Sequence, residues 1–393
     1  MNTLAKVFLL SVALFGFLGI VSLNENTLTA QQKTDLCIVY DVGGRGDLSF
    51  NDMAALGGDN AVKAGHATKL VEVQSKTEQD YLPNLRTLAR TGTCTVVVGV
   101  GFLLTDAMVA VSTESPNQNF AIIDGFIPDK KNVLSVLFKE QEGSALVGAL
   151  GAVLATELKA SSIGVVLGIE IPVLWKFECG YRFGVNYALT QKLKTNKDAV
   201  KVLSNYTGSF GDPAKGKTAT EIMLNQGAIL VYNVAGATGL GIFEAVEARG
   251  KAAGKDQGPP FAIGVDADQD YIKPGFILAS MMKRVDTGVF TAAKQAKEGT
   301  FKGGILELGL NEGGVRLSTV EDLDTFLQLG IKAGTVKAED KDKIVAKVRA
   351  MRASVPASVF AIAAELETKI KSGEVKVPLA QDKDAIEACR KNF

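Results

Sequence analysis

Three carboxylates stand at the ends of apolar, β-prone runs in this sequence. Asp41 ends the first run, and Asp124 and Asp266 end two later ones. A carboxylate accepts hydrogen bonds from hydroxyl and amine donors, and its charge makes these bonds stronger than neutral ones. In open α/β sheets, ligands bind beyond the carboxyl ends of the strands. These residues therefore predict a site for a small polar ligand, with a turn-capping role as the alternative for Asp124.

An aromatic ring and an amide follow Asp41 across a glycine-rich turn. They belong to Phe50 and Asn51, which start a predicted helix with Ser49 as its N-cap. The ring and the amide would together form one wall of a pocket for a flat polar ring. The alternative is an ordinary helix start, with Phe50 packed into the core.

A second group of candidate residues lies further along the chain. Phe210 follows another apolar run and is flanked by glycines, which favours a stacking surface. Gly239 lies in a glycine-rich loop whose G-x-x-G-x-G spacing differs from that of dinucleotide sites, and whose backbone amides can approach a ligand hydroxyl. Lys283 ends the last apolar run of this region, where it could pair with Asp266 or contact the ligand.

Composition excludes several classes of function. His66 is the only histidine, so histidine-based triads and histidine-ligated metal sites lack their parts. No catalytic residue, cofactor or metal is expected. Lys and Arg number 43 and Asp and Glu also number 43, so the sequence predicts no polyanion-binding surface and no nucleic-acid partner.

Apolar runs alternate with helical patterns along nearly the whole chain, as in parallel sheets with crossover helices. The strands expected in a first cycle are 36–42, 69–73, 93–100, 120–123 and 134–138, and those in a second cycle are 163–167, 200–206, 228–234, 261–265 and 276–282. The expected helices include 81–90, 177–192, 213–226, 241–249, 287–297, 341–352 and 359–371. At 393 residues the chain is long enough for two domains. The pattern predicts an α/β protein with two doubly wound lobes and a cleft between them.

The N-terminus has the features of an export signal. Lys6 precedes an apolar run over 7–21. This run is shorter than the ~20 residues that a membrane span needs. We predict a signal peptide over 1–30 with cleavage after Ala30; an uncleaved N-terminal anchor is the alternative. No lipobox precedes Cys37, so the expected location is the periplasm or cell envelope without a recognised lipid anchor.

Four cysteines permit up to two disulfides in three connectivities. Cys37 and Cys94 begin runs expected to be neighbouring parallel strands, whereas Cys179 lies in a predicted helix and Cys389 in the tail. Their spacings match no metal site. Buried free thiols are at least as well supported by the sequence as bridges.

Several motifs together resemble the BMP family of ABC-transporter substrate-binding proteins, which includes purine nucleoside receptors. They cover residues 40–52, 80–86, 120–124, 208–216, 234–241, 264–266 and 280–286. The similarity extends from Leu36 to about Pro378. It implies a periplasmic-binding-protein type I fold, with two parallel-sheet lobes joined by hinge crossovers, that closes on a nucleoside and delivers it to an ABC permease. Many relatives are lipoproteins, and this chain departs from them there.

The resemblance also implies domain limits. They are a signal peptide over 1–30, an N-terminal lobe of 36–139 plus 284–308, a C-terminal lobe of 140–283 plus 309–378, and a C-terminal extension over 379–393.

Roles for individual aromatic residues follow from the same resemblance. Phe50 is expected to stack on one face of the base. Tyr232 matches the aromatic position of the second lobe and would stack on the other face, with Phe210 close by. The family more often has Phe where Tyr232 stands.

Roles for the polar residues are implied in the same way. Asn51 and Asp124 are expected to bond the edge of the base, and Asp266 and Lys283 to bond the ribose hydroxyls, with Gly239 approaching nearby. The expected function is that of a non-enzymatic extracytoplasmic receptor for a purine nucleoside, associated with the membrane through its permease or an uncleaved N-terminal segment. The alternatives are the same fold with a sugar or signalling molecule as ligand, a sensor, or a hydrolase that acts on nucleosides through clustered carboxylates.

Overall fold

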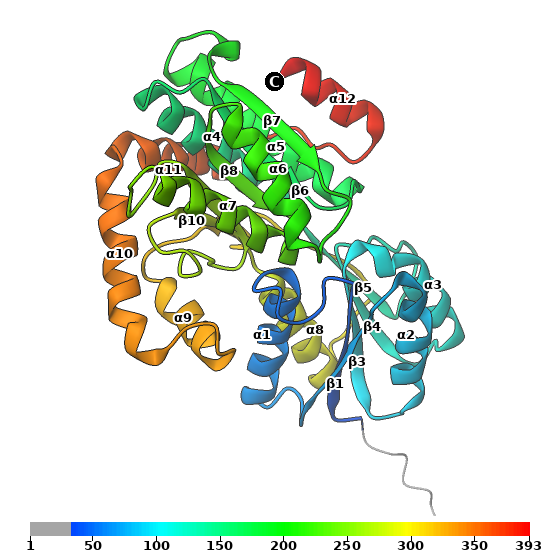
Figure 1. Ribbon diagram of the computed structural model, residues 1–393. Coiled ribbons are helices and arrows are strands. Elements are labelled where there is room, and N and C mark those ends of the chain that lie inside the picture. Colours follow the sequence, from blue (N-terminus) through cyan, green and yellow to red (C-terminus); the bar gives the residue numbers. More distant parts are fainter. Residues whose placement is uncertain (1–32) are drawn as a thin grey trace, which may run out of the picture. The chain divides into compact units, whose positions relative to one another are not determined.

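The structure is a computed structural model that describes residues 33–393. The predicted signal peptide over 1–30 and its cleavage point at Ala30 lie outside the described residues. The described part contains two six-stranded sheets (Figure 1).

The first sheet is entirely parallel. Its strands, in spatial order, are β2 (Leu70–Gln74), β1 (Asp35–Tyr40), β3 (Cys94–Val100), β4 (Asn119–Ile123), β5 (Val133–Phe138) and β11 (Gly304–Leu308). Helices α1 (Phe50–Lys63) and α8 (Val285–Lys297) cover one face, and α2 (Tyr81–Arg90) and α3 (Thr105–Glu114) cover the other. Strands β1 and β3 are buried along their whole length, as expected where helices cover both faces of a parallel sheet.

The second sheet repeats this strand order with one difference. Its strands are β7 (Lys201–Tyr206), β6 (Ser162–Leu167), β8 (Ala228–Val234), β9 (Phe261–Asp266), β10 (Ile277–Lys283) and β12 (Val315–Leu317). The last strand, β12, is antiparallel to β10, whereas β11 of the first sheet is parallel to β5. Helices α4 (Glu140–Glu157) and α5 (Pro172–Tyr187) pack on one face, and α6 (Pro213–Asn225) and α7 (Gly239–Ala252) on the other.

The chain crosses between the two sheets three times. The crossings lie between β5 and α4, between β10 and α8, and between β11 and β12. Backbone hydrogen bonds join neighbouring crossings: the N–H of Lys139 donates to Leu308 O over 3.1 Å, and the N–H of Arg284 donates to Gly314 O over 2.8 Å. The crossings therefore form one hydrogen-bonded bundle.

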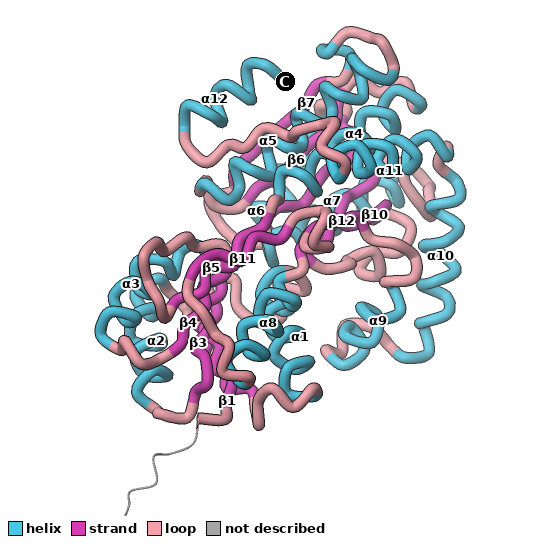
Figure 2. Tube along the Cα trace, turned by 180° about the vertical axis from the view of Figure 1, so that it is seen from behind, coloured by secondary structure: helices cyan, strands magenta, loops and turns pink. Residues whose placement is uncertain are grey.

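The C-terminal part is helical, and two of its helices pack on helices of the second sheet. It contains α9 (Leu323–Lys332), α10 (Lys341–Ser354), α11 (Ala357–Lys371) and α12 (Lys383–Asn392). Helix α11 packs against α4, and α12 lies beside α5 and β7 (Figure 2). Short helical turns complete the chain at Glu78–Asp80, Phe102–Leu104, Ala188–Lys192, Lys197–Ala199, Gly236–Thr238 and Ala338–Asp340. Within residues 33–393, no helix combines the length and apolar character needed to cross a bilayer.

Helices α4 and α5 approach each other very closely through glycines. A methyl group on Gly184 would overlap the carbonyl oxygen of Ala145, and one on Gly148 would overlap that of Tyr181. Only glycine allows such contact between two helix backbones. This pair of helices is consequently a rigid unit beneath the second sheet.

All four cysteines are bridged in the structure. Cys37 on β1 bonds to Cys94 at the start of β3, with the Cα atoms 5.7 Å apart, and Cys179 on α5 bonds to Cys389 on α12, with the Cα atoms 5.5 Å apart. The sequence left free thiols and bridges open, and the structure contains two bridges.

Candidate functional site

A cavity lies where the carboxyl ends of the two sheets face each other. It contains about 590 Å³ of empty space, including the solvent at its mouth. Seven of the nine sequence-predicted site residues line it: Asp41, Phe50, Asn51, Asp124, Phe210, Asp266 and Lys283. The position of these residues at strand ends is the placement that α/β topology predicts.

Asn51 is fixed by two carboxylates of its own lobe. Its Nδ2 donates to Asp41 Oδ1 over 2.9 Å and to Asp47 Oδ2 over 3.2 Å. Because Nδ2 faces both carboxylates, Oδ1 is the amide atom that remains free, and it has no hydrogen-bond partner among residues 33–393. Asn51 thus offers a buried acceptor to whatever fills the cavity.

The start of α1 differs from the sequence prediction. Ser49 was expected to cap this helix, but its side chain makes no capping bond. Instead Asp47 accepts the backbone N–H of Ser49 and of Asn51, each over 2.9 Å. The Ser49 hydroxyl is left to donate to Asp266 Oδ2 over 2.7 Å, so it connects the first lobe to a carboxylate of the second.

Asp124 and Lys283 form a buried ion pair at the cavity wall. Lys283 Nζ lies 2.6 Å from Asp124 Oδ2, and Asp124 Oδ1 has no partner in the described chain. Burial opposes the charge on Lys283, but the carboxylates of Asp124 and Glu140 outweigh it and raise its pKa. Lys283 is accordingly a charged ammonium group, and its ion-pair partners are Asp124 and Glu140 rather than the Asp266 that the sequence suggests.

Burial raises the pKa of several cavity carboxyls, among them Asp41 and Asp266. The pKa of Asp41 rises to about 6, although hydrogen bonds from Asn51 and Gly43 oppose this. The pKa of Asp266 also rises to about 6 through burial, opposed by the charge of Lys283. Both groups change protonation state close to neutral pH, and hydrogen-bond donors on a ligand would favour their charged forms.

Aromatic rings supply much of the apolar wall. Phe50 and Phe102 come from the first lobe, and Phe177 and Phe210 from the second. Lys283 Nζ lies 5.1 Å from the ring centre of Phe50 and 5.6 Å from that of Phe177, within the range of cation–π attraction. Rings on opposing lobes beside buried acceptors can enclose a flat polar heterocycle.

Two sequence-predicted site residues lie outside the cavity. The side chain of Tyr232 is fully buried, with its hydroxyl 3.3 Å from Ser144 Oγ and its ring centre 5.5 Å from that of Tyr181. Tyr232 lies two residues before the end of β8, so its ring packs between the sheet and α4 and α5 and does not reach past the strand's end. Tyr232 therefore does not line the cavity, and this placement does not support its expected stacking role.

Gly239 is the second of these residues. It begins α7, and a methyl group there would overlap the side chain of Asn233. Gly236 of the same loop lines the cavity instead, with a positive φ of 56°. Gly236, and not the Gly239 that the sequence favours, is therefore the glycine of this loop at the cavity wall.

The start of α5 contributes wall residues that the sequence analysis did not select. Ile171, Val173, Leu174 and Phe177 line the cavity, since the helix begins at Pro172 rather than at 177. Pro172 at the first helical position was the available sequence signal.

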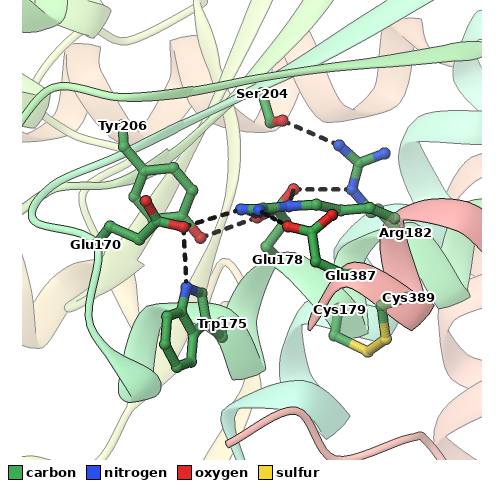
Figure 3. A network of polar contacts seen from close by, with 10 residues as sticks. Glu170, Trp175, Glu178, Cys179, Arg182, Ser204, Tyr206, Glu387 and Cys389 are labelled. Carbon is green, nitrogen blue, oxygen red and sulfur yellow. Dashed lines mark hydrogen bonds and ion pairs between the residues drawn. A yellow bond between two sulfur atoms is a disulfide. The ribbon is translucent and has the colours of Figure 1, made fainter. Parts of the chain in front are cut away.

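The opposite face of α5 is held by the C-terminal extension (Figure 3). Arg390 of α12 lies 2.7 Å from Glu178 Oε2, beside the Cys179–Cys389 bridge. Trp175 Nε1 donates to Glu170 Oε1 over 3.2 Å, and Trp175 packs with α12 outside the cavity. Helix α5 therefore lines the cavity with one face and is fixed to α12 by the other.

Comparison with known proteins assigns the chain to a family. The sequence profile of the Bmp family, described as ABC transporter substrate-binding protein PnrA-like, matches residues 35–347. The chain belongs to the Bmp family. It is an ABC transporter substrate-binding protein and not an enzyme, which confirms the resemblance drawn from the motifs.

Individual Bmp relatives match most of the chain. A protein of Pyrococcus abyssi described as an uncharacterized lipoprotein is 40% identical over 364 residues, covering 91% of this chain and 87% of its own. An ABC transporter nucleoside-binding protein of Lactococcus lactis subsp. cremoris is 36% identical over 331 residues, covering 80% of this chain and 89% of its own.

A solved structure confirms the Bmp fold. The crystal structure of an ABC transporter solute-binding protein from Aeropyrum pernix K1 has a TM-score of 0.84 and 38% identity, and covers 90% of this chain and 96% of that one. The predicted fold class, a periplasmic-binding-protein type I arrangement of two parallel α/β sheets, is correct.

Proposed function

We propose that this substrate-binding protein captures a purine nucleoside between its two lobes and delivers it to an ABC permease. The observation that carries the proposal is the combination of aromatic rings from both lobes with unpartnered buried acceptors in one cavity. A relative described as nucleoside-binding supports the same ligand class.

The aromatic walls suit a nucleobase. Phe50 comes from one lobe and Phe177 and Phe210 from the other, so a flat ring bound between them contacts both lobes at once. Stacking on an aromatic side chain is worth about 1–3 kcal/mol per base. Phe177 and Phe210 replace Tyr232 as the proposed second stacking surface.

The buried acceptors suit a base edge that carries N–H donors. Asn51 Oδ1 and Asp124 Oδ1 both lack partners in the part of the chain that the structure describes. Leaving a buried acceptor unpaired costs about 1–3 kcal/mol, so a ligand that supplies donors gains this energy. We propose that these two atoms bond the base.

The ribose hydroxyls are assigned to Asp266, with Lys283 as a donor beside it. Asp266 Oδ2 accepts the Ser49 hydroxyl, which supports a hydroxyl-accepting role for this carboxylate. The carboxylates Asp41, Asp124 and Asp266 would repel a phosphate, so nucleosides are proposed over nucleotides. Lobe closure then supplies contacts that neither lobe makes alone.

The proposed location is outside the cytoplasmic membrane. The Pyrococcus relative is described as a lipoprotein, whereas no lipobox precedes Cys37, the first cysteine of this sequence. We propose that this protein associates with the membrane through its permease or through the segment over 1–30.

Isothermal calorimetry on the purified protein tests the proposal. The panel contains guanosine, inosine, adenosine, uridine, free guanine, ribose and galactose. We expect purine nucleosides to bind at least about tenfold more tightly than guanine or the sugars, a difference of about 1.4 kcal/mol. Tighter binding of a sugar, or equal affinity for guanine and guanosine, would contradict the assignment, and cleavage of guanosine would indicate a hydrolase.

A further inference from the structure

Glu140 is a buried carboxylate that the proposed nucleoside site leaves without a role. It is the first residue of α4, has 0% exposure, and is absent from the cavity wall. A charged carboxylate without water is costly unless cations compensate it. The structure places two ammonium groups against it.

The three chain crossings explain why Glu140 stands at this position. The first crossing is hydrogen bonded to the third by Lys139 N–H and Leu308 O, and the third to the second by Arg284 N–H and Gly314 O. The pair between Glu140, at the first crossing, and Lys283, at the second, closes this triangle with Nζ and Oε1 2.9 Å apart. It is a side-chain link between the first and second crossings, next to the contact between Lys283 Nζ and the ring of Phe138.

The Glu140 carboxylate belongs to a series of alternating charges. Lys176 Nζ lies 2.5 Å from Glu140 Oε2, and Lys283 Nζ lies 2.9 Å from Glu140 Oε1 and 2.6 Å from Asp124 Oδ2. Lys176 also donates to the carbonyl oxygen of Phe138 over 2.9 Å. This series of charges begins with Lys176 on α5 and ends with Asp124, a cavity-wall residue whose Oδ1 has no partner in the described residues.

We propose that Glu140 is a positioning residue, which holds the Lys283 ammonium group at the cavity wall and against Asp124 by joining the first and second chain crossings. Without Glu140, Lys283 would keep Asp124 as its one ion-pair partner among the described residues, and the buried Lys176 would have none. The stem of Lys283 could then leave the rings of Phe50 and Phe138, whose centres lie 5.1 and 5.0 Å from Nζ. The consequence for a ligand rests on the proposed nucleoside function; the placement of Lys283 does not.

The test needs a variant that stays folded. Glu140→Gln alone leaves the buried Lys176 without an ion-pair partner in the described chain, so we pair it with Lys176→Met, which restores the balance of one ammonium group and one carboxylate. Lys176→Met alone is the matched control, because it keeps the Glu140–Lys283 pair. Circular dichroism and the thermal midpoint establish that each variant is folded.

The first readout needs no ligand. The protein is treated briefly with an amine-acetylating reagent, and modification of Lys283 is quantified by mass spectrometry relative to Lys337, whose side chain is 76% exposed. Lys283 has 1% side-chain exposure and is expected to be protected in the native chain and in Lys176→Met. We expect its modification to rise several-fold in the double variant.

The second readout is guanosine affinity by calorimetry. We expect the double variant to bind at least about tenfold more weakly than Lys176→Met. Protection of Lys283 that is unchanged in the double variant would overturn the proposal. Increased modification with unchanged affinity would support the placement of Lys283 by Glu140 and overturn the role of Lys283 in ligand binding. If the native chain binds no nucleoside, the proposed function fails, and the acetylation comparison alone decides whether Glu140 positions Lys283.

Discussion

Asp124 and Asp266 are structural counterparts in the two lobes. Asp124 directly follows β4 and Asp266 ends β9, and these strands occupy the same place in the two sheet orders. Both residues have left-handed backbones, with φ of 67° and 64°. This conformation is uncommon outside glycine and is found at functional sites where surrounding structure enforces it. The repeated strand end thus presents one carboxylate from each lobe to the same cavity.

Replacing Asp266 should weaken nucleoside binding without unfolding the protein. Asp266→Asn keeps a residue that tolerates positive φ and removes the charge that would accept ribose hydroxyls. We expect at least about a tenfold loss of guanosine affinity in calorimetry. Asp129→Asn is the matched control, because Asp129 also has a positive φ, of 59°, and is exposed away from the cavity. An equal effect of both substitutions would reject the role of Asp266.

Phe50→Ala should reduce affinity through lost stacking. The ring lies on the cavity wall and near Lys283 Nζ, so its removal leaves one face of a bound base uncovered. We expect a loss of about 1–3 kcal/mol in guanosine binding. Phe290→Ala, at a ring that packs edge-on against His66 outside the cavity, should leave affinity within about threefold. Retained affinity in Phe50→Ala would remove this residue from the site.

Affinity and stability should depend on pH in opposite directions near pH 6. The folded-state pKa of Asp266 is raised from 3.8 to about 6 by burial, so the folded chain binds more protons than the unfolded chain between these values. The free energy of unfolding of the unliganded protein therefore falls as pH rises through this range. Ribose donors favour the charged carboxylate, so guanosine affinity should rise from pH 5 to pH 7.

Denaturant unfolding and calorimetry between pH 4 and pH 8 measure both effects. Asp266→Asn should flatten the decline in stability, although Asp41, with a pKa also raised to about 6, keeps part of it. Affinity that falls from pH 5 to pH 7 would show that a protonated carboxyl, and not a carboxylate, contacts the ligand.

The close contact of α4 and α5 predicts a fold-destabilising substitution. In Gly184→Ala, the new methyl group meets the backbone carbonyl of Ala145, which cannot move without separating the helices. We expect a loss of about 1–3 kcal/mol in the free energy of unfolding, measured with guanidinium. Gly211→Ala serves as control, since the nearest atom to its methyl group is Val42 O at 3.7 Å. Equal stability of both variants would contradict the tight packing.

Strand positions could be predicted from the sequence because each buried parallel strand is a continuous apolar run. All ten strands expected before residue 284 are present within a few residues of their predicted limits. Helix α4 was not identified, because it is apolar all round and lacks an amphipathic pattern: it is buried from Gly143 to Ala155. The helical form of α12 was also missed, since its stability comes from contacts with α5 that no local pattern reveals.

Site residues at strand ends could be predicted, and those whose role depends on packing could not. Asp124 and Asp266 were identified because a charge after an apolar run marks the carboxyl end of a strand. Tyr232 was misplaced, since family position alone does not show how far a ring reaches from its strand. Glu140 and Lys176 have no local signal, because they meet only when the crossings come together.

Removing the Cys179–Cys389 bridge should lower the free energy of unfolding and leave guanosine affinity nearly unchanged. The bridge closes a separation of 210 residues, and Cys37–Cys94 closes one of 57, so its entropic effect on the unfolded chain is larger by about 1 kcal/mol. We expect Cys179→Ser with Cys389→Ser to lower the free energy of unfolding by about 2–5 kcal/mol.

Guanosine affinity of that double-serine variant should stay within about threefold of the native value. The reason is that α5 remains packed on α4 through Gly180 and Gly184 after α12 is released, so its cavity face stays in place. The Cys37→Ser with Cys94→Ser variant, measured in the same guanidinium titration and calorimetry, is the comparison. A large loss of affinity confined to the Cys179–Cys389 variant would mean that α12, and not α4, fixes the wall formed by Leu174 and Phe177.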